Sequence, residues 1–349
     1  MLSSQDALRA LAILSPAPRI VCICHRNPDG DAVGALLGME LLLEKVYPGK
    51  EVAIHCADGV LPETFRFLPG ALRVQGVPVL REKDAIVFLD CAEPKLTEME
   101  TSCPVLFDRS HPSLNIDHHP TNTRYALENF VFPDASSACE ILVHLADALG
   151  WPLDSDSATC LLLGIETDTG GFLHSNTSAA TYRTAARLLR AGARGQEITQ
   201  EVFRKAKLST LKLWGRVLEK IMVTEEGGAV AAVTEGDFQA ADADYEELTG
   251  AIDYVNAVPG MRFSLILSER NGKVRGSLRT LREDVDVAAM ASKWSGGGHT
   301  KAAGFAIPGK LKPEVRWKVV PESSPAKPQE SPLAKPPAAP EEPVVFPFA

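Results

Sequence analysis

Four short apolar runs in the first half of this chain each end in acidic or imidazole side chains, and this pattern constrains the fold more than any other feature. The runs ending at Cys24, Leu89 and Ile116 are short and rich in β-branched residues, as expected for buried parallel strands. In an open α/β sheet, ligands bind beyond the carboxyl ends of the strands. Four such strand-end clusters would therefore meet at one place. The candidate metal ligands are His25, Asp29, Asp31, Asp90, His118 and Asp168.

The residue types favour two divalent cations over one. Carboxylates and imidazoles without cysteine at the ends of the runs suit Mn²⁺ or Mg²⁺ better than a structural zinc. Six ligands exceed the usual protein complement of one catalytic metal, whereas a bridging carboxylate would let them hold a pair about 3.5–4 Å apart. Such a pair can clamp the attacking and leaving oxygens of a phosphoryl displacement. We therefore expect two Mn²⁺ ions, with Mg²⁺ or Co²⁺ as alternatives.

Each segment also has an ordinary structural interpretation. Asp90 could cap a helix, because aspartate is a favoured N-cap residue. Asp117 could hold a neighbouring ring through a hydrogen bond. The turn residues of Pro28–Asp31 predict a tight loop, and the small residues of Ala32–Gly38 predict a helix start that packs closely behind the site. Caps and turns alone do not account for four such clusters together, so the metal-site hypothesis is preferred.

A second signal lies nearer the other end of the chain. Residues 295–304 contain three consecutive glycines, which allow backbone N–H groups to approach an anion. Upstream, Lys273–Arg279 alternates in the manner of a strand, and a guanidinium on that face suits phosphate recognition. The alternative is a flexible glycine loop beside an exposed edge strand. The candidate substrate-binding residues are Arg275, Ser277, Arg279, Gly297, Gly298, His299 and Lys301.

The order of these motifs resembles the DHH phosphoesterase superfamily. The matching segments are His25–Asp31, Leu89–Asp90, Asp117–His119, Thr167–Gly170, the glycine run Gly296–Gly304 typical of a DHH-associated domain, and Asp134–Glu140, to which no individual roles are given. The resemblance implies that His25, Asp29 and Asp90 hold one metal. It also implies that Asp31, Asp90, His118 and Asp168 hold the second, with Asp90 as the bridge. His119 would face the scissile phosphate, so His119 and Asp90 are the expected catalytic residues.

Size and domain content are similar to the nanoRNase type A group within this superfamily. That resemblance implies hydrolysis of short oligoribonucleotides to mononucleotides and of 3′-phosphoadenosine 5′-phosphate to AMP. Two departures concern substrate contacts: Ser295 stands where a glycine is usual, and Leu173 where relatives often have a basic residue. A phosphodiesterase for cyclic or linear dinucleotides and a non-catalytic nucleotide-binding protein remain alternatives. Substrate length, RNA against DNA, and a homodimer are left open.

The segment pattern predicts an α/β chain with a parallel-sheet domain over residues 1–195 and a helical connector over 196–220. A smaller α/β domain over 221–310 would open with a hairpin from Ile221 to Val233, and the active site would lie in the cleft between the domains. Residues 311–349 form a predicted Pro-rich disordered tail of unknown partner, with nine prolines beyond Val320. A net charge of −9 argues against a protein that coats nucleic acid. Seven scattered cysteines and no apolar run near about 20 residues predict a cytoplasmic protein without a membrane span.

Overall fold

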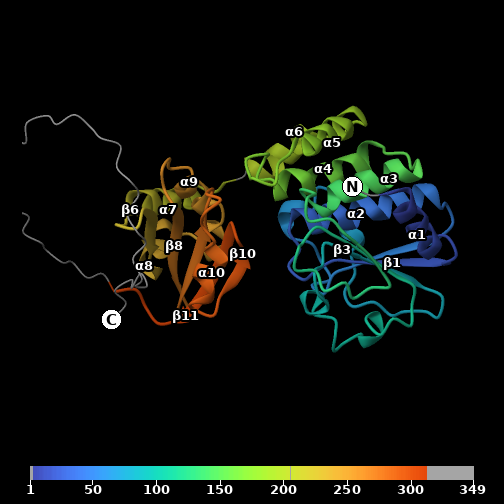
Figure 1. The fold of residues 1–349 in the computed structure, drawn as a ribbon, viewed down its shortest axis with the longest axis horizontal. Coiled ribbons are helices and arrows are strands. Elements are labelled where there is room, and N and C mark those ends of the chain that lie inside the picture. The colour runs from blue at the N-terminus through green and yellow to red at the C-terminus, as the bar shows by residue number, and fades with distance from the viewer. Residues whose placement is uncertain (1–2, 205, 313–349) are drawn as a thin grey trace, which may run out of the picture. The chain divides into compact units, whose positions relative to one another are not determined.

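The computed structural model describes residues 3–204 and 206–312, and the chain divides into two compact units, Met1–Lys205 and Ala206–Ala349 (Figure 1). The predicted Pro-rich tail lies almost entirely outside the described residues. The exact domain limits and the cleft between domains stay predictions. Within the described residues, no helix is both long enough and apolar enough to cross a membrane.

The described part of the first unit contains a five-stranded parallel sheet in the order β2-β1-β3-β4-β5. The three strands expected from the sequence are confirmed as β1, β3 and β4. From β1 the chain adds β2 on one side and β3 on the other, so the strand order reverses between β1 and β3. Such a switch point opens a crevice at the carboxyl ends of the strands. The strands are β1 (Arg19–Ile23), β2 (Glu51–His55), β3 (Ala85–Leu89), β4 (Ser113–Asp117) and β5 (Glu128–Val131).

Helices cover one face of this sheet, and loops that include the 3₁₀ segment η4 cover the other (Figure 1). On the helical face, apolar side chains from β1, β3 and β4 share a core with α1 to α4. On the opposite face, Phe88 stacks with Phe107 and contacts the Tyr125 ring edge-on. The elements are α1 (Ser4–Leu14), α2 (Gly30–Val46), η1 (Glu63–Phe65), η2 (Ala71–Arg73), η3 (Pro94–Thr97), η4 (Pro104–Leu106), α3 (Ala138–Leu149), α4 (Ser155–Asp168) and α5 (Ala179–Arg190).

The expected close packing of the glycine-containing helix is confirmed. Gly34 of α2 lies directly against α4, because a Cβ atom at this position would be only 2.4 Å from the Cys160 carbonyl oxygen. Gly164 of α4 is equally enclosed, since its Cβ would lie 2.3 Å from Cys139 Sγ and 2.6 Å from Asp31 Oδ1. Small residues therefore set the separation between the two helices that carry acidic candidate ligands.

The stretch predicted as a helical connector forms separate helical pieces. Helix α6 (Gly195–Ile198) and the π-helical turn η5 (Thr199–Phe203) precede α7 (Leu208–Glu219). The N-cap residue of α7, Lys207, has an extended backbone with φ −68° and ψ 157°. Since this conformation cannot continue a helix, the described residues of the connector, 196–204 and 206–220, do not form one continuous helix. Helix α7 instead contributes Leu213 and Val217 to the core of the second unit.

The second unit is a mixed six-stranded sheet in the order β10-β11-β9-β8-β7-β6 within the described residues. The predicted hairpin is confirmed, because β6 and β7 pair antiparallel. Helices α7 to α9 pack on one face and α10 on the other. The elements are β6 (Met222–Val223), β7 (Gly228–Val233), α8 (Glu235–Ala241), η6 (Tyr245–Leu248), α9 (Ala251–Asn256), β8 (Phe263–Arg270), β9 (Lys273–Arg279), α10 (Val287–Ser292), β10 (Gly297–His299) and β11 (Ala302–Pro308).

Candidate metal centre

All six candidate ligands gather beyond the carboxyl ends of the strands in the first unit. His25 and Asp29 follow β1, Asp90 follows β3, and His118 follows β4. Asp31 lies in the first turn of α2. The expectation that the fourth cluster also ends a strand is wrong, because Asp168 is the last residue of α4. A short apolar run has the same periodicity in a buried helix as in a buried strand, so the run before Asp168 did not distinguish the two.

The spacing of the ligand atoms suits a shared cation better than direct hydrogen bonds. His118 Nε2 lies 3.6 Å from Asp168 Oδ2, 3.7 Å from Asp90 Oδ1 and 4.0 Å from Asp31 Oδ2. On the other side of Asp90, His25 Nε2 lies 3.7 Å from Asp90 Oδ2 and 3.9 Å from Asp29 Oδ1. These separations exceed hydrogen-bond length. Ligand atoms about 2.0–2.2 Å from a common cation would lie roughly 3–4 Å apart.

Asp90 stands at the centre of the cluster. Its two carboxylate oxygens face different imidazoles, and Oδ1 is buried without a hydrogen-bond partner. The residue also adopts a left-handed backbone with φ +52°, a conformation that costs energy for a residue with a side chain. A buried carboxylate on a strained backbone, with one oxygen that accepts no hydrogen bond, is a suitable bridging ligand for two cations. Burial acts to raise the pKa of Asp90, but the contacts with His25, His118 and His119 lower it overall.

Asp31 is held by the N-terminus of α3. The backbone N–H of Ala138 donates to Asp31 Oδ2 at 2.6 Å, and that of Cys139 donates to Oδ1 at 3.0 Å. Free N–H groups at a helix N-terminus favour a carboxylate. These contacts give a role to the Asp134–Glu140 segment, which the sequence left unassigned. The N-cap hydrogen bond from the Glu140 N–H to Ser137 Oγ marks the start of that helix.

Burial and neighbouring carboxylates raise the pKa of two of the candidate ligands, Asp31 and Asp168. Burial, reinforced by Asp90, Asp168 and Asp29, raises the pKa of Asp31 well above its usual range. Burial and the charge of Asp90 likewise raise the pKa of Asp168 to about 6, although His118 acts in the opposite direction. Like charges crowded in a buried site are unfavourable without counter-charge. The donor set therefore fits divalent cations.

The first histidine is oriented by the backbone. His25 Nδ1 lies 2.8 Å from the Arg26 carbonyl oxygen, which fixes the proton on Nδ1. Nε2 then faces Asp29 and Asp90 and can bind a cation together with them. Burial lowers the pKa of His25, but the contact with Asp90 outweighs it and raises the pKa to about 9. His25, Asp29 and Asp90 form one group whose ligand atoms lie within 4.8 Å of one another.

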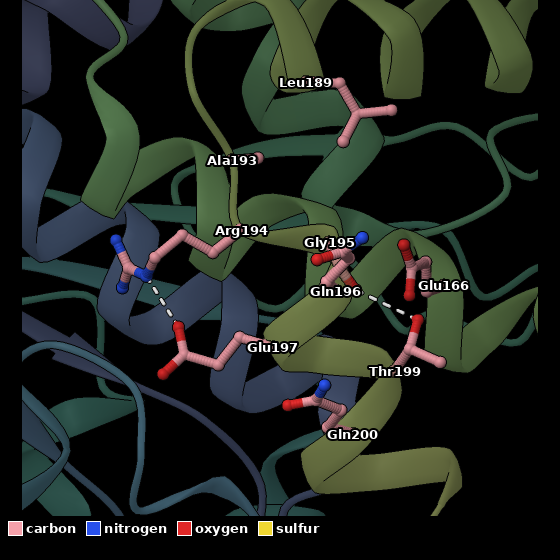
Figure 2. Close-up of a pocket in the computed structure, with 9 residues that line it drawn as sticks. All are labelled: Glu166, Leu189, Ala193, Arg194, Gly195, Gln196, Glu197, Thr199 and Gln200. Atoms are coloured by element: carbon pink, nitrogen blue, oxygen red, sulfur yellow. Dashed lines mark hydrogen bonds and ion pairs between the residues drawn. The ribbon is translucent and has the colours of Figure 1, made fainter.

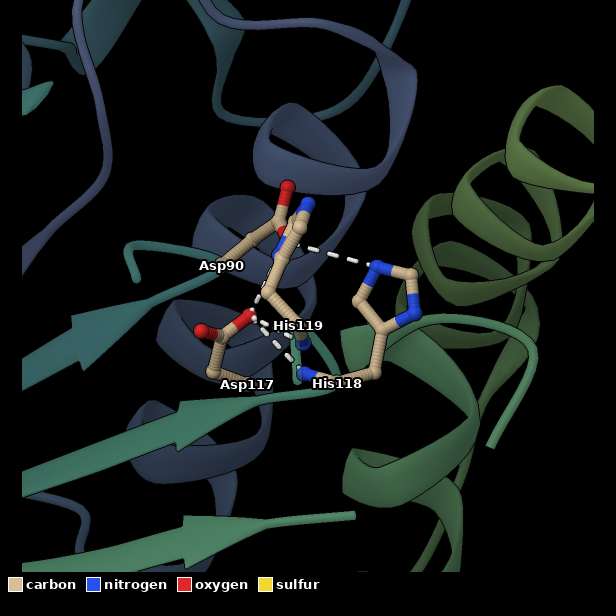
Figure 3. A group of neighbouring side chains, drawn as sticks. All are labelled: Asp90, Asp117, His118 and His119. Atoms are coloured by element: carbon tan, nitrogen blue, oxygen red, sulfur yellow. Dashed lines mark hydrogen bonds and ion pairs between the residues drawn. The ribbon is translucent and has the colours of Figure 1, made fainter. Parts of the chain in front are cut away.

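Asp90, Asp117, His118 and His119 form a second such group (Figure 3). Asp117 is nevertheless poorly suited to bind a cation, because it is fully buried and both oxygens are already occupied. Oδ1 accepts from the His118 and His119 backbone N–H groups at 2.8 and 3.2 Å, and lies 2.7 Å from His119 Nδ1. Oδ2 accepts from Asn122 at 2.5 Å. Asp117 therefore positions the two histidines, as its alternative structural interpretation expected.

His119 contacts both Asp117 and Asp90. Its Nδ1 lies 3.4 Å from Asp90 Oδ1 in addition to the contact with Asp117. Burial lowers the pKa of His119, but the hydrogen bond with Asp117 and the charge of Asp90 raise it to about 9. An imidazole held in this way can donate a proton or a hydrogen bond to an anion at the cluster.

An open pocket of about 930 Å³ in the first unit shares no residue with this cluster, and Figure 2 shows the residues that line it. Glu166, Arg194, Glu197 and Thr199 are among its lining residues, and none of the six candidate ligands is. Burial raises the pKa of Glu166 to about 7. Arg194 pairs with Glu197 across 2.6 Å. The pocket adds no ligand to the metal centre, although Glu166 is only two residues from Asp168.

The substrate-binding candidates lie in the second unit, on strands β9 and β10 and in the turn that follows β10. The expected alternation of β9 is confirmed, since Arg275 and Ser277 are exposed while Val274 and Leu278 are buried. The strand pairing aligns Arg279 with Ala302 and His299, and aligns Ser277 with Gly304 and Gly297. The aligned glycines Gly297 and Gly304 thus leave the backbone without side chains next to Ser277.

Gly298 and Lys301 differ from the other candidates. Gly298 has φ +142°, and a Cβ there would lie 2.5 Å from the Ala302 carbonyl oxygen. The antiparallel pair of β10 and β11 therefore requires a glycine at this position. Lys301 Nζ donates to the Arg282 carbonyl oxygen at 2.5 Å and pairs with Glu283 at 3.3 Å. The lysine is therefore engaged with the loop after β9. Sequence reasoning had no signal for these tertiary partners.

Comparison with known proteins agrees with this architecture. The model of the DHH family, N-terminal domain, matches residues 19–165, and that of the DHHA1 domain matches residues 226–320. The bifunctional oligoribonuclease and PAP phosphatase NrnA of Thermus thermophilus is 35% identical over 82% of this chain and 83% of the relative. NrnA of Bacillus subtilis is 26% identical over 81% and 87%.

The fold is also found in a solved structure, that of an exopolyphosphatase-related protein from Bacteroides fragilis. It superposes with a TM-score of 0.81 at 23% identity, covering 88% of this chain and 93% of that one. DHH phosphoesterases bind divalent metals, and the cluster around Asp90 has the residues to do so. The chain belongs to the DHH family, with a DHH N-terminal domain followed by a DHHA1 domain.

Proposed function

We propose that this protein is a Mn²⁺-dependent phosphoesterase that hydrolyses short oligoribonucleotides to mononucleotides and 3′-phosphoadenosine 5′-phosphate to AMP. The observation that carries the proposal is the single cluster of six candidate ligands around the buried, unsatisfied carboxylate of Asp90. The names of the two NrnA relatives support the substrate class. The ligand chemistry supports Mn²⁺, since hard oxygens and imidazoles both suit it.

In this proposal, His25, Asp29 and Asp90 would hold one cation, and Asp31, Asp90, His118 and Asp168 the other. When bound, the two cations would supply positive charge to the phosphate and lower the pKa of a nearby water.

The chain's own residues orient the reacting groups. His119, anchored by Asp117, donates a hydrogen bond to a phosphate oxygen, while the N-terminus of α3 keeps Asp31 in place. In the second unit, Arg279 and His299 bind a terminal phosphate of the substrate, and the aligned glycines accommodate its nucleotide at close range.

The proposal is tested with the purified full chain, Mn²⁺ and a panel of labelled substrates. The panel contains di- to pentanucleotides, a 20-mer, 3′-phosphoadenosine 5′-phosphate and cyclic di-AMP. Short oligoribonucleotides and the bisphosphate should be hydrolysed much faster than the 20-mer, because the basic candidates Arg275, Arg279 and Lys301 lie only on β9 and just after β10, too short a stretch for a long charged channel. Chelation should abolish turnover. Preference for cyclic di-AMP would favour the alternative phosphodiesterase, and no turnover of any substrate would favour a nucleotide-binding protein.

Two variants test the metal centre itself. Asp90→Ala removes the proposed bridge, and Asp90→Asn keeps its shape while removing its charge; both should lose activity and bound metal. Asp108→Ala is the matched control, since Asp108 is an exposed aspartate of the same unit that accepts a local hydrogen bond from the Ser110 N–H. Full activity in both Asp90 variants would contradict the two-cation proposal.

A further inference from the structure

Asn176 contacts the candidate ligand Asp168 from a loop to which the sequence assigned no role. Its Nδ2 lies 3.0 Å from the Ser136 carbonyl oxygen, 3.3 Å from the Asp168 carbonyl oxygen and 3.4 Å from Asp168 Oδ2. Its Oδ1 is buried and has no hydrogen-bond partner among the described residues. All three neighbours of Nδ2 are oxygens, so a flipped amide would place Oδ1 against three acceptors. The amide must therefore present its N–H groups to Asp168.

Among the three carboxylates proposed for the second cation, that of Asp168 is the one the surrounding residues confine least. Its side chain is 28% exposed, compared with 1% for Asp31 and 2% for Asp90. Asp168 is also the final residue of α4, where the helix no longer confines the side chain on its C-terminal side. The oxygen that Asn176 contacts, Oδ2, is the same oxygen that lies 3.6 Å from His118 Nε2. An N–H donor on this oxygen restricts the rotation of the carboxylate.

The other contact of Asn176 leads to the segment that holds Asp31. Ser136 accepts from Asn176 through its carbonyl oxygen, and its N–H and Oγ both donate to Glu140 Oε2 at 2.7 Å. Glu140 is in the first turn of α3, whose N-terminus binds Asp31. Asn176 thus joins the end of α4 to the start of α3. The end of α4 carries Asp168 and the start of α3 binds Asp31, and these are two of the four ligands proposed for the second cation.

We infer that Asn176 is a positioning residue that fixes the Asp168 carboxylate for the second cation of the cluster. The inference rests on the proposed function, in which Asp168 is a ligand of that cation and not of the first. Losing a contact that orients a metal ligand typically weakens metal affinity by about 10- to 100-fold. The loss should fall on one of the two cations, because His25, Asp29 and Asp90 make no hydrogen bond with Asn176 in the described residues.

The test is a Mn²⁺ titration of the metal-free full chain, followed by electron paramagnetic resonance and calorimetry. The unaltered protein should bind two ions, and Asn176→Ala should bind one ion normally and the other about 10- to 100-fold more weakly. Thr177→Val is the matched control. Thr177 is the next residue, and its buried hydroxyl has no hydrogen-bond partner in the described residues, so this nearly isosteric change should leave both affinities unaltered.

Thermal unfolding of the metal-free variants separates positioning from a purely structural role. If Asn176→Ala lowers the melting temperature but binds both ions as the unaltered protein does, Asn176 only supports the fold and the inference is overturned. Equal weakening at both sites also overturns it. If the unaltered protein binds no Mn²⁺, the proposed function itself has failed, which is a distinct result from two normal sites in the variant.

Discussion

Replacing Gly34 with alanine should separate the two helices that carry acidic ligands. The added Cβ would lie 2.4 Å from the Cys160 carbonyl oxygen and 3.0 Å from both Cys139 Sγ and Gly164 N. Ordinary contacts of this kind begin at 3.4 Å, so α2 and α4 would have to part by about 1 Å at the closest atom. The obstructing atom is backbone and cannot rotate away as the end of a side chain could.

The expected cost follows from two opposing effects. Overpacking a close-packed interior costs about 1–3 kcal/mol, and a rigid backbone contact belongs at the upper end of that range. Alanine in a helix interior is favoured over glycine by about 1 kcal/mol. The net loss is therefore about 2 kcal/mol in the free energy of unfolding. For a unit of this size, each kcal/mol shifts the melting temperature by about 2–4 °C, so a decrease of about 4–8 °C is expected.

The same shift should disturb metal binding, because Asp31 lies in the first turn of α2 and Asp168 ends α4. A displacement of about 1 Å is large beside the 3.6 Å and 4.0 Å separations of these carboxylates from His118 Nε2. Differential scanning calorimetry would measure stability, and elemental analysis after dialysis would measure retained Mn²⁺. An unchanged melting temperature together with full metal content would refute the packing argument.

Gly215→Ala is the matched control for this experiment. Gly215 lies on the exposed side of α7, and a Cβ there meets no atom within 4 Å. The change should raise stability by about 1 kcal/mol through helix propensity alone. If both glycine variants behaved alike, the contact with Cys160 would not be the cause of the Gly34 effect.

Three further predictions concern other parts of the molecule. Arg279→Ala should lower kcat/KM for dinucleotides by a factor that corresponds to about 1–3 kcal/mol, because a charge-assisted phosphate contact is lost. Bound Mn²⁺, measured by elemental analysis, should not change; loss of metal would assign Arg279 a structural role. Asp154 caps α4, and although burial opposes the change, the Ser157 N–H and Lys45 lower its pKa to about 2, so its stabilisation should be present above about pH 4 and lost as the pH falls to 2. Asp154→Ala should thus cost about 1 kcal/mol at pH 7 in urea unfolding, a difference that shrinks as the pH falls to 2; Asp154→Asn keeps a capping oxygen and loses only the charge, so it should cost less. Ser295 has φ +57°, so Ser295→Gly should relieve backbone strain and stabilise by about 0.5–1 kcal/mol; a lower urea midpoint would contradict this.

Much of the candidate site could be predicted from local sequence. The apolar runs before His25, Asp90 and His118 are short and β-branched, and each is a parallel strand in the structure. The alternation from Lys273 to Arg279 predicted one exposed face, because successive side chains of a strand point to opposite sides. The run before Asp168 was ambiguous, since a fully apolar segment has no periodicity that separates helix from strand.

The sequence by itself determined the strand ends, the turn before α2 and the polar face of β9, because these depend on residues within a few positions of one another. Only the tertiary structure decided how the side chains are used. Asp31 accepts from Ala138, 107 positions away, Asp117 is saturated by its own hydrogen bonds, and Asn176 reaches both Ser136 and Asp168. Such partners meet only when helices and strands pack, and packing depends on the shapes of many side chains at once. Local patterns therefore identified the ligands, whereas the fold selected the groups that orient them.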